Sequence, residues 1–275
     1  MAFPVFHPLL KRVSRSFYLS LRLLPESVRP TISLAYLLAR ASDSIADVAS
    51  APEELRARLL NGLPSLWPPE VLGDLGDLAG ADRELIEAMP GLLEALRSSP
   101  DREEIERVWQ TIRGGQAFDL ERFPGDSDPL TLEEAGRYAG LVAGCVGEFW
   151  TDICFKHIPN YSPESPATMR RLGFSFGCGL QWVNILRDRH ADAAAGRVYV
   201  DAKNFSAGLV IARGHLADGS RYADLVGSRR LRAACRLPLL LAVRTLDLVG
   251  ASPAHPRVKV SRWFVWRSLA HAALR

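Results

Sequence analysis

Apolar residues recur mostly three or four positions apart along this chain, and the strict alternation typical of half-buried strands is scarce. This spacing predicts an all-α fold. The helices expected from it span residues 9–24, 31–48, a short segment that begins at Pro52, 82–97, 101–113, 131–150, 163–195, 222–250 and 257–274. The segment after the long helix, up to Gly219, is expected to be rich in loops, as is the segment 64–69.

Local signals mark several helix ends. Pro25 stops the first predicted helix and Pro30 opens the second, because proline fits the first turn of a helix but not its interior. Thr131 and Glu134 have the spacing of a capping box, in which each side chain bonds to the backbone N–H of the other residue. These signals support the boundaries that the apolar pattern indicates.

The long predicted helix carries an unusual polar row. Gly177, Gln181, Asn184, Asp188 and Asp192 lie three or four residues apart and therefore share one face, while apolar residues occupy the other sides. Two carboxylates at i and i+4 repel each other unless a positive charge lies between them. A divalent cation would supply that charge, and Mg²⁺ prefers oxygen ligands of this kind. The alternative interpretation is a solvated polar stripe.

A second acidic row ends the second predicted helix. Asp43 and Asp47 are again four residues apart, Arg40 lies one turn earlier on the same face, and the preceding turns are nearly all apolar. About 140 residues separate the two aspartate pairs. If the pairs face each other across a helical bundle, they could hold Mg²⁺ ions that neutralise a diphosphate. Three arginines could bind the departing charge: Arg40, Arg187 and Arg197.

Glycines recur on two of the predicted helices. Gly140, Gly144 and Gly147 lie on one, and Gly173 and Gly177 lie on the long helix. Each glycine costs a helix about 1 kcal/mol relative to alanine, so a row of them needs a reason. Two interpretations remain open, which are close packing between helices and space for a bulky apolar ligand.

A hydroxyl-rich segment, Ser14-Arg15-Ser16-Phe17, lies within the first predicted helix. One interpretation is a solvated helical turn. The other is a phosphate contact, because arginine and serine side chains donate hydrogen bonds well to phosphate oxygens.

Composition and charge are those of an ordinary soluble protein of 275 residues. It is 48% hydrophobic and 24% charged, and its net charge of +3 is too small to predict nucleic-acid binding. The four cysteines form no C-x-x-C pair, which favours buried thiols in a reducing compartment. The sequence shows neither the order of a signal peptide nor an apolar run of about 20 residues. We therefore expect a cytoplasmic protein.

The last predicted helix combines basic and aromatic residues. They are Arg257, Lys259, Trp263, Arg262, Phe264, Trp266, Arg267 and Arg275. Such a segment can dock on a membrane surface, which would make the protein peripheral at the inner face of the membrane. The alternative is a packed final helix whose arginines extend to solvent.

Four ordered segments resemble the squalene/phytoene synthase family of head-to-head prenyl transferases, in particular its bacterial squalene synthase-like members. The resemblance covers roughly residues 10 to 200. The matching segments are Ser14 to Phe17, Ala39 to Asp47, Tyr138 with Val142 to Gly147, and Gln181 to Asp192 with Gly196 to Tyr199. Both D-x-x-x-D rows belong to these segments.

The resemblance implies an isoprenoid-synthase helical bundle, with a single domain over residues 1–275 and a central apolar cavity for two prenyl diphosphates. It implies the Mg²⁺ ligands Asp43, Asp47, Asp188 and Asp192. The diphosphate contacts that it implies are Ser14, Arg40, Gln181, Asn184, Arg187 and Arg197. Tyr138 would act at the reaction centre with Arg40 and Arg187. Discrimination by chain length would come from residues such as Tyr36, Phe149, Trp150 and Phe176.

The reaction implied by the resemblance joins two farnesyl diphosphates through presqualene diphosphate to squalene, with NADPH as hydride donor if squalene is the product. Alternatives within the fold are phytoene or dehydrosqualene synthesis, cyclisation, and prenyl transfer to another acceptor. An alternative of another class is a non-catalytic helical subunit. Two departures from the family pattern bear on the later half of the reaction. Val200-Asp201 follows Tyr199 where proline is common, and the segment 244–247 lacks a tyrosine.

Overall fold

A computed structural model describes residues 6–14, 17–48, 51–63, 65, 75–76, 78–124, 128–253, 255, 258–261 and 263–268. Every regular element in these ranges is helical, as the apolar spacing predicted. The elements are α1 (His7–Val13), α2 (Phe17–Leu23), α3 (Arg29–Ala46), α4 (Glu53–Gly62), α6 (Gly80–Glu87), α7 (Met89–Arg97), α8 (Arg102–Arg122), α9 (Leu132–Ala139), the π-helical segment η2 (Gly140–Gly144), α10 (Cys145–His157), α11 (Pro166–Ala194), α12 (Phe205–Leu225) and α13 (Arg229–Ala251).

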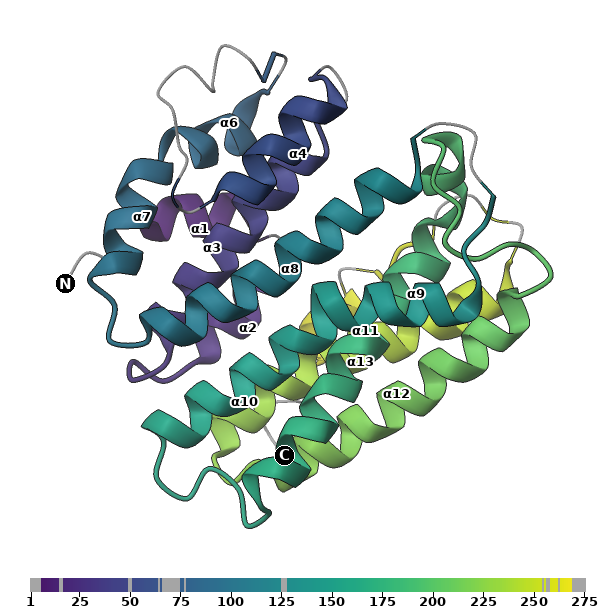
Figure 1. Ribbon diagram of the computed structural model, residues 1–275. Helices are drawn as coiled ribbons and strands as arrows, with labels where there is room; N and C mark the ends of the chain where they lie inside the picture. Colours follow the sequence, from purple (N-terminus) through teal and green to yellow (C-terminus); the bar gives the residue numbers. More distant parts are fainter. Residues whose placement is uncertain are drawn as a thin grey trace.

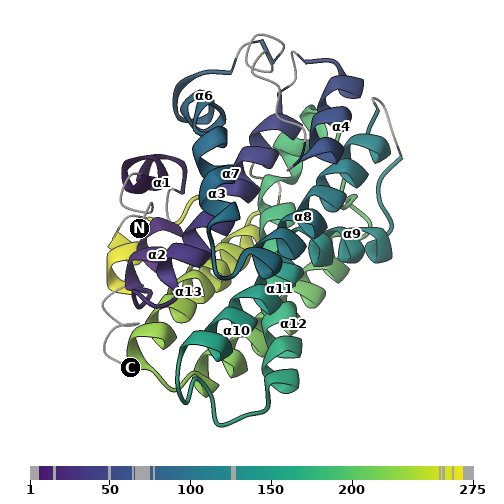
Figure 2. The same cartoon turned by 60° about the vertical axis from the view of Figure 1, so that its left-hand side comes forward.

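The helices form two groups with α8 between them (Figure 1 and Figure 2). Helices α1 to α4, α6 and α7 lie on one side, and α9 to α13 lie on the other. Helix α8 packs against α3 and α4 on the first side and against η2 and α10 on the second. Helix α11 contacts η2, α10, α12 and α13. One hydrophobic cluster includes buried side chains from both groups, so the groups share a core.

Helix α3 is buried along most of its length, and Arg40 and Asp43 are among the few side chains that the core leaves partly exposed. Pro30 lies in its first turn, where the missing N–H has no helical partner to lose. Leu37, Leu38 and Ile45 are fully buried and fix the orientation of the helix. Apolar packing therefore holds the end of α3 that carries Asp43.

Helix α11 begins with strong local signals and is held by buried bulk. The Ser165 side chain accepts a hydrogen bond from the Thr168 backbone N–H, and Pro166 occupies the first turn. Trp182 and Leu186 are almost completely buried along its length. These contacts fix the rotation of the helix and hence the direction of its polar row.

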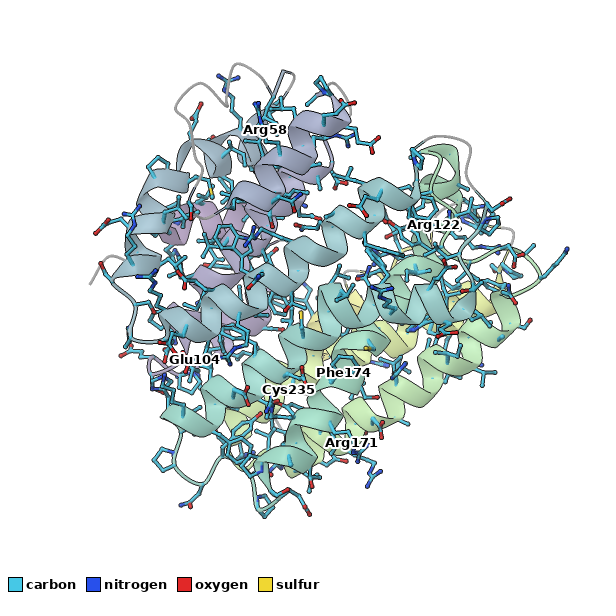
Figure 3. All side chains as sticks on the ribbon, viewed as in Figure 1. Arg58, Glu104, Arg122, Arg171, Phe174 and Cys235 are labelled. Atoms are coloured by element: carbon cyan, nitrogen blue, oxygen red, sulfur yellow. The ribbon has the colours of Figure 1, made fainter. Side chains whose placement is uncertain are left out.

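The glycine rows bring backbones together, which confirms the close-packing interpretation. A Cβ atom added at Gly147 would lie 1.9 Å from the carbonyl oxygen of Gly173, and one at Gly177 would lie 2.0 Å from that of Ala143. The ring of Phe174 fills the space over Gly144 (Figure 3). Side chains at these positions would force η2 and α10 away from α11.

Two predicted helices are each divided in the structure, so these predictions were wrong. The segment 9–24 forms α1, which ends at Val13, and α2, which begins at Phe17. The Ser14 side chain, directly after α1, donates to the Leu10 carbonyl oxygen. The segment 82–97 forms α6 and α7, and the break at Ala88 precedes Pro90 in the first turn of α7. Proline has no N–H to donate to the preceding turn, so it fits the first turn of a helix better than its interior.

Two further predictions were wrong because glycines were taken as helix ends. Helix α8 continues nine residues beyond the predicted end at Arg113, and Gly115 lies against Leu141 and Val142. The expected loop before Gly219 is the helix α12. Its glycines make room for bulky α11 side chains, since Gly208 lies against Trp182 and Leu186, and Gly219 against Phe176. Helix α13 accordingly begins at Arg229, later than predicted.

Other local predictions agree with the structure. Thr131 and Glu134 form the complete capping box, and all four cysteines are buried and unpaired. Residues 263–268 are helical, while the remainder of the predicted last helix lies largely outside the described residues, as does most of the predicted loop 64–69. Within the described ranges, each helix is too short or too polar to cross a bilayer.

Replacing Gly177 with alanine is expected to destabilise the protein by about 1–3 kcal/mol, because the new methyl group would overlap the Ala143 carbonyl. Gly114 is the matched control, since it is exposed within α8 and a Cβ atom there would meet nothing within 4 Å. Gly114→Ala should leave the stability unchanged or raise it by up to about 1 kcal/mol. Urea unfolding of the two variants measures both effects. Equal stabilities would contradict close packing at Gly177.

Candidate active site

Two adjoining spaces open between the helix groups. The larger, here called the apolar cavity, has a volume of about 650 Å³ and is lined by residues from α2, α3, α8, η2, α10, α11, α12 and α13, among others. The smaller, the acidic pocket, has a volume of about 260 Å³. Five residues line both spaces: Asp43, Gln116, Tyr138, Gln181 and Asn184. The two spaces are therefore continuous, with a polar end and an apolar end.

The acidic pocket brings together the two aspartate pairs that the sequence analysis identified. Asp43 and Asp47 come from the end of α3, and Asp188 and Asp192 from the end of α11. A fifth carboxylate, Asp119 of α8, also lines the pocket. Sequence analysis did not identify Asp119, because no second carboxylate stands near it in the helical repeat. Only the packing of α8 between the two groups places it here.

Burial of these carboxylates, with a smaller contribution from their mutual repulsion, raises two of their pKa values. Removal from water and the Asp47 charge raise the pKa of Asp43 to about 6, although Arg40 opposes the shift. Removal from water raises the pKa of Asp192 to about 6, with Asp188 and Asp119 adding to the shift and Arg197 opposing it. Asp43 retains 44% of its side-chain exposure, so pocket water and ions can reach it.

Each arginine that was predicted to bind diphosphate already contacts a carboxylate. Arg40 pairs with Asp43 and, at 2.9 Å, with Asp82 of α6. Arg187 makes a two-pronged contact with its neighbour Asp188. Arg197 lies 3.2 Å from Asp47. These pairs hold positive charge at the rim of the pocket and partly offset the repulsion between its carboxylates.

The donor set of the acidic pocket fits Mg²⁺ that is shared with a ligand. Among the described residues, no three histidine, cysteine or acidic side chains converge closely enough to form a ready-made metal centre. Mg²⁺, however, commonly binds through one or two carboxylates together with phosphate oxygens and water. The two carboxylate pairs match that arrangement, with Asp43 and Asp47 at the end of α3 and Asp188 and Asp192 at the end of α11.

The neutral residues predicted to contact diphosphate also line the two spaces. Gln181 and Asn184 lie where the acidic pocket meets the apolar cavity, and the Asn184 amide is 3.4 Å from the Gln181 carbonyl oxygen. Ser14 lines the apolar cavity. Arg15 and Ser16, from the same hydroxyl-rich segment, lie outside the described residues.

Tyr138 lies at the border between the two spaces, as a residue of the reaction centre would. Burial and the nearby charge of Asp119 raise the pKa of its hydroxyl far above the ordinary value, so it stays protonated. Its ring stacks on that of Tyr199, with centroids 5.0 Å apart and planes 24° apart. A neutral, electron-rich ring is thereby fixed at the boundary.

The wall of the apolar cavity includes three of the four side chains that were expected to control chain length. Tyr36, Trp150 and Phe176 line it, whereas Phe149 does not and is packed in the core. Further wall residues, which sequence analysis missed, come from α12 and α13. They are Tyr222, Ala234, Cys235 and Pro238, and Cys235 is labelled in Figure 3. No sequence signal marked them, because their role depends on how α12 and α13 pack.

Comparisons with known proteins identify proteins that this chain resembles. A sequence profile described as squalene/phytoene synthase matches residues 10–210. The bifunctional lycopene cyclase/phytoene synthase of Colletotrichum graminicola is 30% identical over 197 residues, which cover 70% of this chain and 33% of that protein. Squalene synthase ERG9 of Saccharomyces cerevisiae is 26% identical over 287 residues, covering 92% of this chain and 63% of that protein. The chain thus spans about a third of the length of the bifunctional relative.

A solved structure of TcSQS with a bound ligand has the same fold. The TM-score is 0.81 at 22% identity, and the match covers 99% of this chain and 86% of that chain. At this identity the likeness establishes the fold alone. It confirms the all-α architecture that the apolar spacing predicted.

Replacing Asp192 with asparagine is expected to stabilise the protein in the absence of divalent cations. Folding raises the pKa of Asp192 to about 6, so the folded state favours the protonated carboxyl and disfavours the ionised one. The stability that the protonated carboxyl contributes is therefore lost as the pH rises through 6. The gain from Asp192→Asn should be about 1 kcal/mol at pH 7.5, since water in the pocket screens the charge, and should vanish near pH 3, below the ordinary pKa of an aspartate.

Thermal unfolding in EDTA at the two pH values measures this gain. Glu121→Gln is the control, because it removes one negative charge from an exposed position of α8 outside the pocket. A destabilised Asp192→Asn variant at pH 7.5 would contradict repulsion in the pocket.

Proposed function

Because the chain belongs to the squalene/phytoene synthase family, we propose that it is a prenyltransferase that joins two prenyl diphosphates head to head. The observation that carries the proposal is an acidic pocket continuous with an apolar cavity, with Asp43 and Tyr138 at their border. A diphosphate suits the polar end, and a hydrocarbon chain suits the apolar end. The proposal treats residues 1–275 as one catalytic domain.

The two aspartate pairs are proposed to hold Mg²⁺ at the polar end, with Asp43 and Asp47 on one wall and Asp188 and Asp192 on the other. Bound Mg²⁺ would neutralise the diphosphate and so help it leave. Bound Mg²⁺ would also relieve the repulsion between these carboxylates. This accounts for carboxylates that are costly to place together without a cation.

The diphosphate itself is proposed to bind the polar side chains around the pocket. Arg40, Arg187 and Arg197 would exchange part of their contacts with carboxylates for phosphate oxygens, which guanidinium groups bind in a two-pronged geometry. The neutral contacts are proposed to be Ser14, Gln181 and Asn184. Together these side chains would orient the bond that breaks towards the apolar cavity.

Tyr138 is proposed to act at the reaction centre. An aromatic face attracts a cation, and Tyr138 presents its ring where the allylic cation would separate from the diphosphate. Its hydroxyl stays protonated because its pKa is raised by burial, so it offers a neutral dipole and not a base. The surrounding wall, including Trp150 and Phe176, would exclude water from the cation.

We propose farnesyl diphosphate as the substrate and presqualene diphosphate, then squalene, as the products. Support comes from the extent of similarity, since the match to squalene synthase ERG9 covers 92% of the chain and that to the bifunctional phytoene synthase 70%. Reduction to squalene would require NADPH. Nothing in the described residues identifies a site for it, so the proposal derives no step from it. Phytoene and dehydrosqualene synthesis are the rival activities within the same site.

Contact with an anionic membrane surface is proposed for residues 258–261 and 263–268. Trp263 and Trp266 are 67% and 66% exposed, and the guanidinium of Arg267 lies 4.9 Å from the Trp263 ring centroid. Exposed tryptophan beside basic residues is typical of interfacial segments.

Asp188→Asn is expected to lower turnover at least about 100-fold, because the amide cannot replace a metal-binding carboxylate. The substrate is farnesyl diphosphate with Mg²⁺ and with or without NADPH, and the products are identified by mass spectrometry. The melting temperature should change little, since Asp188 is 44% exposed and the change relieves repulsion with Asp192. Unchanged turnover with strong destabilisation would refute the site assignment.

The same assay separates the alternative functions. A forty-carbon product from geranylgeranyl diphosphate, without a thirty-carbon product from farnesyl diphosphate, would indicate phytoene synthesis. Consumption of one prenyl diphosphate without coupling would indicate cyclisation or transfer to another acceptor. No consumption of either substrate would favour the non-catalytic subunit and would refute the proposed activity.

A further inference from the structure

Asp119 is a fifth carboxylate in the acidic pocket, and it belongs to neither D-x-x-x-D pair. It lies near the end of α8, and only 13% of its side-chain surface is exposed. A carboxylate with so little access to water needs protein groups that satisfy its oxygens. The identity of those groups indicates what Asp119 does.

Both oxygens of Asp119 face the short segment that follows α11. Oδ1 accepts a hydrogen bond from the Tyr199 hydroxyl, and Oδ2 lies 3.8 Å from Nη1 of Arg197. The same Nη1 lies 3.2 Å from Oδ1 of Asp47. Asp119 therefore has a protein group beside each of its oxygens.

The segment that Asp119 contacts is also tied down by its backbone. The Arg197 N–H donates to the Asp192 carbonyl oxygen at 2.8 Å, and the Leu130 N–H donates to the Val198 carbonyl oxygen at 2.9 Å. These bonds place the segment between the end of α11 and the start of α9. Its side chains can then be set by contacts with α8.

Tyr199 transmits the position of Asp119 to the reaction centre. Its ring is buried between two others, with Tyr138 stacked on it at 5.0 Å and Phe123 edge-on at 5.3 Å between centroids. A hydrogen bond at the Tyr199 hydroxyl fixes where this ring lies. The Tyr138 ring, at the border between pocket and cavity, rests against that fixed plane.

We propose that Asp119 is a positioning residue, which holds Tyr138 through Tyr199 and holds Arg197 beside Asp47. Its expected effect on turnover rests on the proposed function, whereas the contacts themselves do not. A misplacement of about 1 Å at a reaction centre can cost on the order of 100-fold in rate. A residue that touches neither substrate nor metal can therefore control turnover here.

The first test compares a variant that keeps a hydrogen-bond acceptor with one that removes it. Asp119→Asn retains an acceptor oxygen for the Tyr199 hydroxyl and should keep turnover within about fivefold of the parent chain. Asp119→Leu removes the acceptor and should lower turnover at least about 30-fold, with little change in KM. Glu121→Gln, on the exposed face of the same helix, is the control. Equal losses in the Asn and Leu variants would overturn the proposal.

The Mg²⁺ requirement separates positioning from metal binding. The concentration of Mg²⁺ that gives half-maximal rate should stay within about twofold in Asp119→Asn, because the proposed ligands remain. An increase of about tenfold or more would identify Asp119 as a metal ligand and overturn the proposal.

A folding double-mutant cycle tests the contact without any activity. Asp119→Leu and Tyr199→Phe each remove one side of the same hydrogen bond, so their effects on the unfolding equilibrium constant should be non-additive by at least about threefold. Additive effects would overturn the proposal. If the parent chain turns over no prenyl diphosphate, the proposed function fails, while a coupled cycle still supports the Asp119–Tyr199 contact.

Discussion

Repulsion among aspartates at the ends of two helices is the constraint on which the rest of the structure depends. Asp43 and Asp47 face Asp188 and Asp192 across one pocket, and the pKa values of Asp43 and Asp192 show the cost. The helices cannot relax apart, because their apolar faces are anchored in the common core. Salt bridges from arginines on the rim offset part of the charge. The negative charge that the arginines leave unpaired can be neutralised by a cation.

Close packing between helices fixes the position of α11, which carries Asp188 and Asp192, relative to η2 and α10. Glycines on η2 and α10 meet glycines on α11 at backbone contact, so the relative position of these helices is fixed to within the size of one methyl group. The same backbones form part of the cavity wall, where Gly147, Gly173 and Gly177 leave space beside the aromatic side chains. One row of small residues thus serves both packing and the shape of the cavity.

Local patterns predicted much of this fold and site, and tertiary packing determined the rest. The two aspartate pairs could be found because a spacing of four places residues on one helix face without knowledge of any neighbour. Helix α12 could not be found in this way, because a segment with several glycines is typical of a loop. Its glycines are explained only once Trp182 and Phe176 of α11 are known to lie against them. Asp119 was missed because its partners are 78 and 80 residues away in sequence. Asp82 was missed for the same reason.

The π-helical segment η2 sets the angular phase between two parts of the cavity wall. In an unbroken α-helix, the twelve steps from Tyr138 to Trp150 would leave their side chains about 120° apart around the axis. The five residues of η2 have i to i+5 bonding, and each turns the helix by roughly 82° instead of about 100°. The angle between the Tyr138 and Trp150 side chains is thereby reduced to about 30°. Both side chains line the apolar cavity. The wider turns of η2 thus let α9 and α10 present Tyr138 and Trp150 to the same cavity without a loop between the helices.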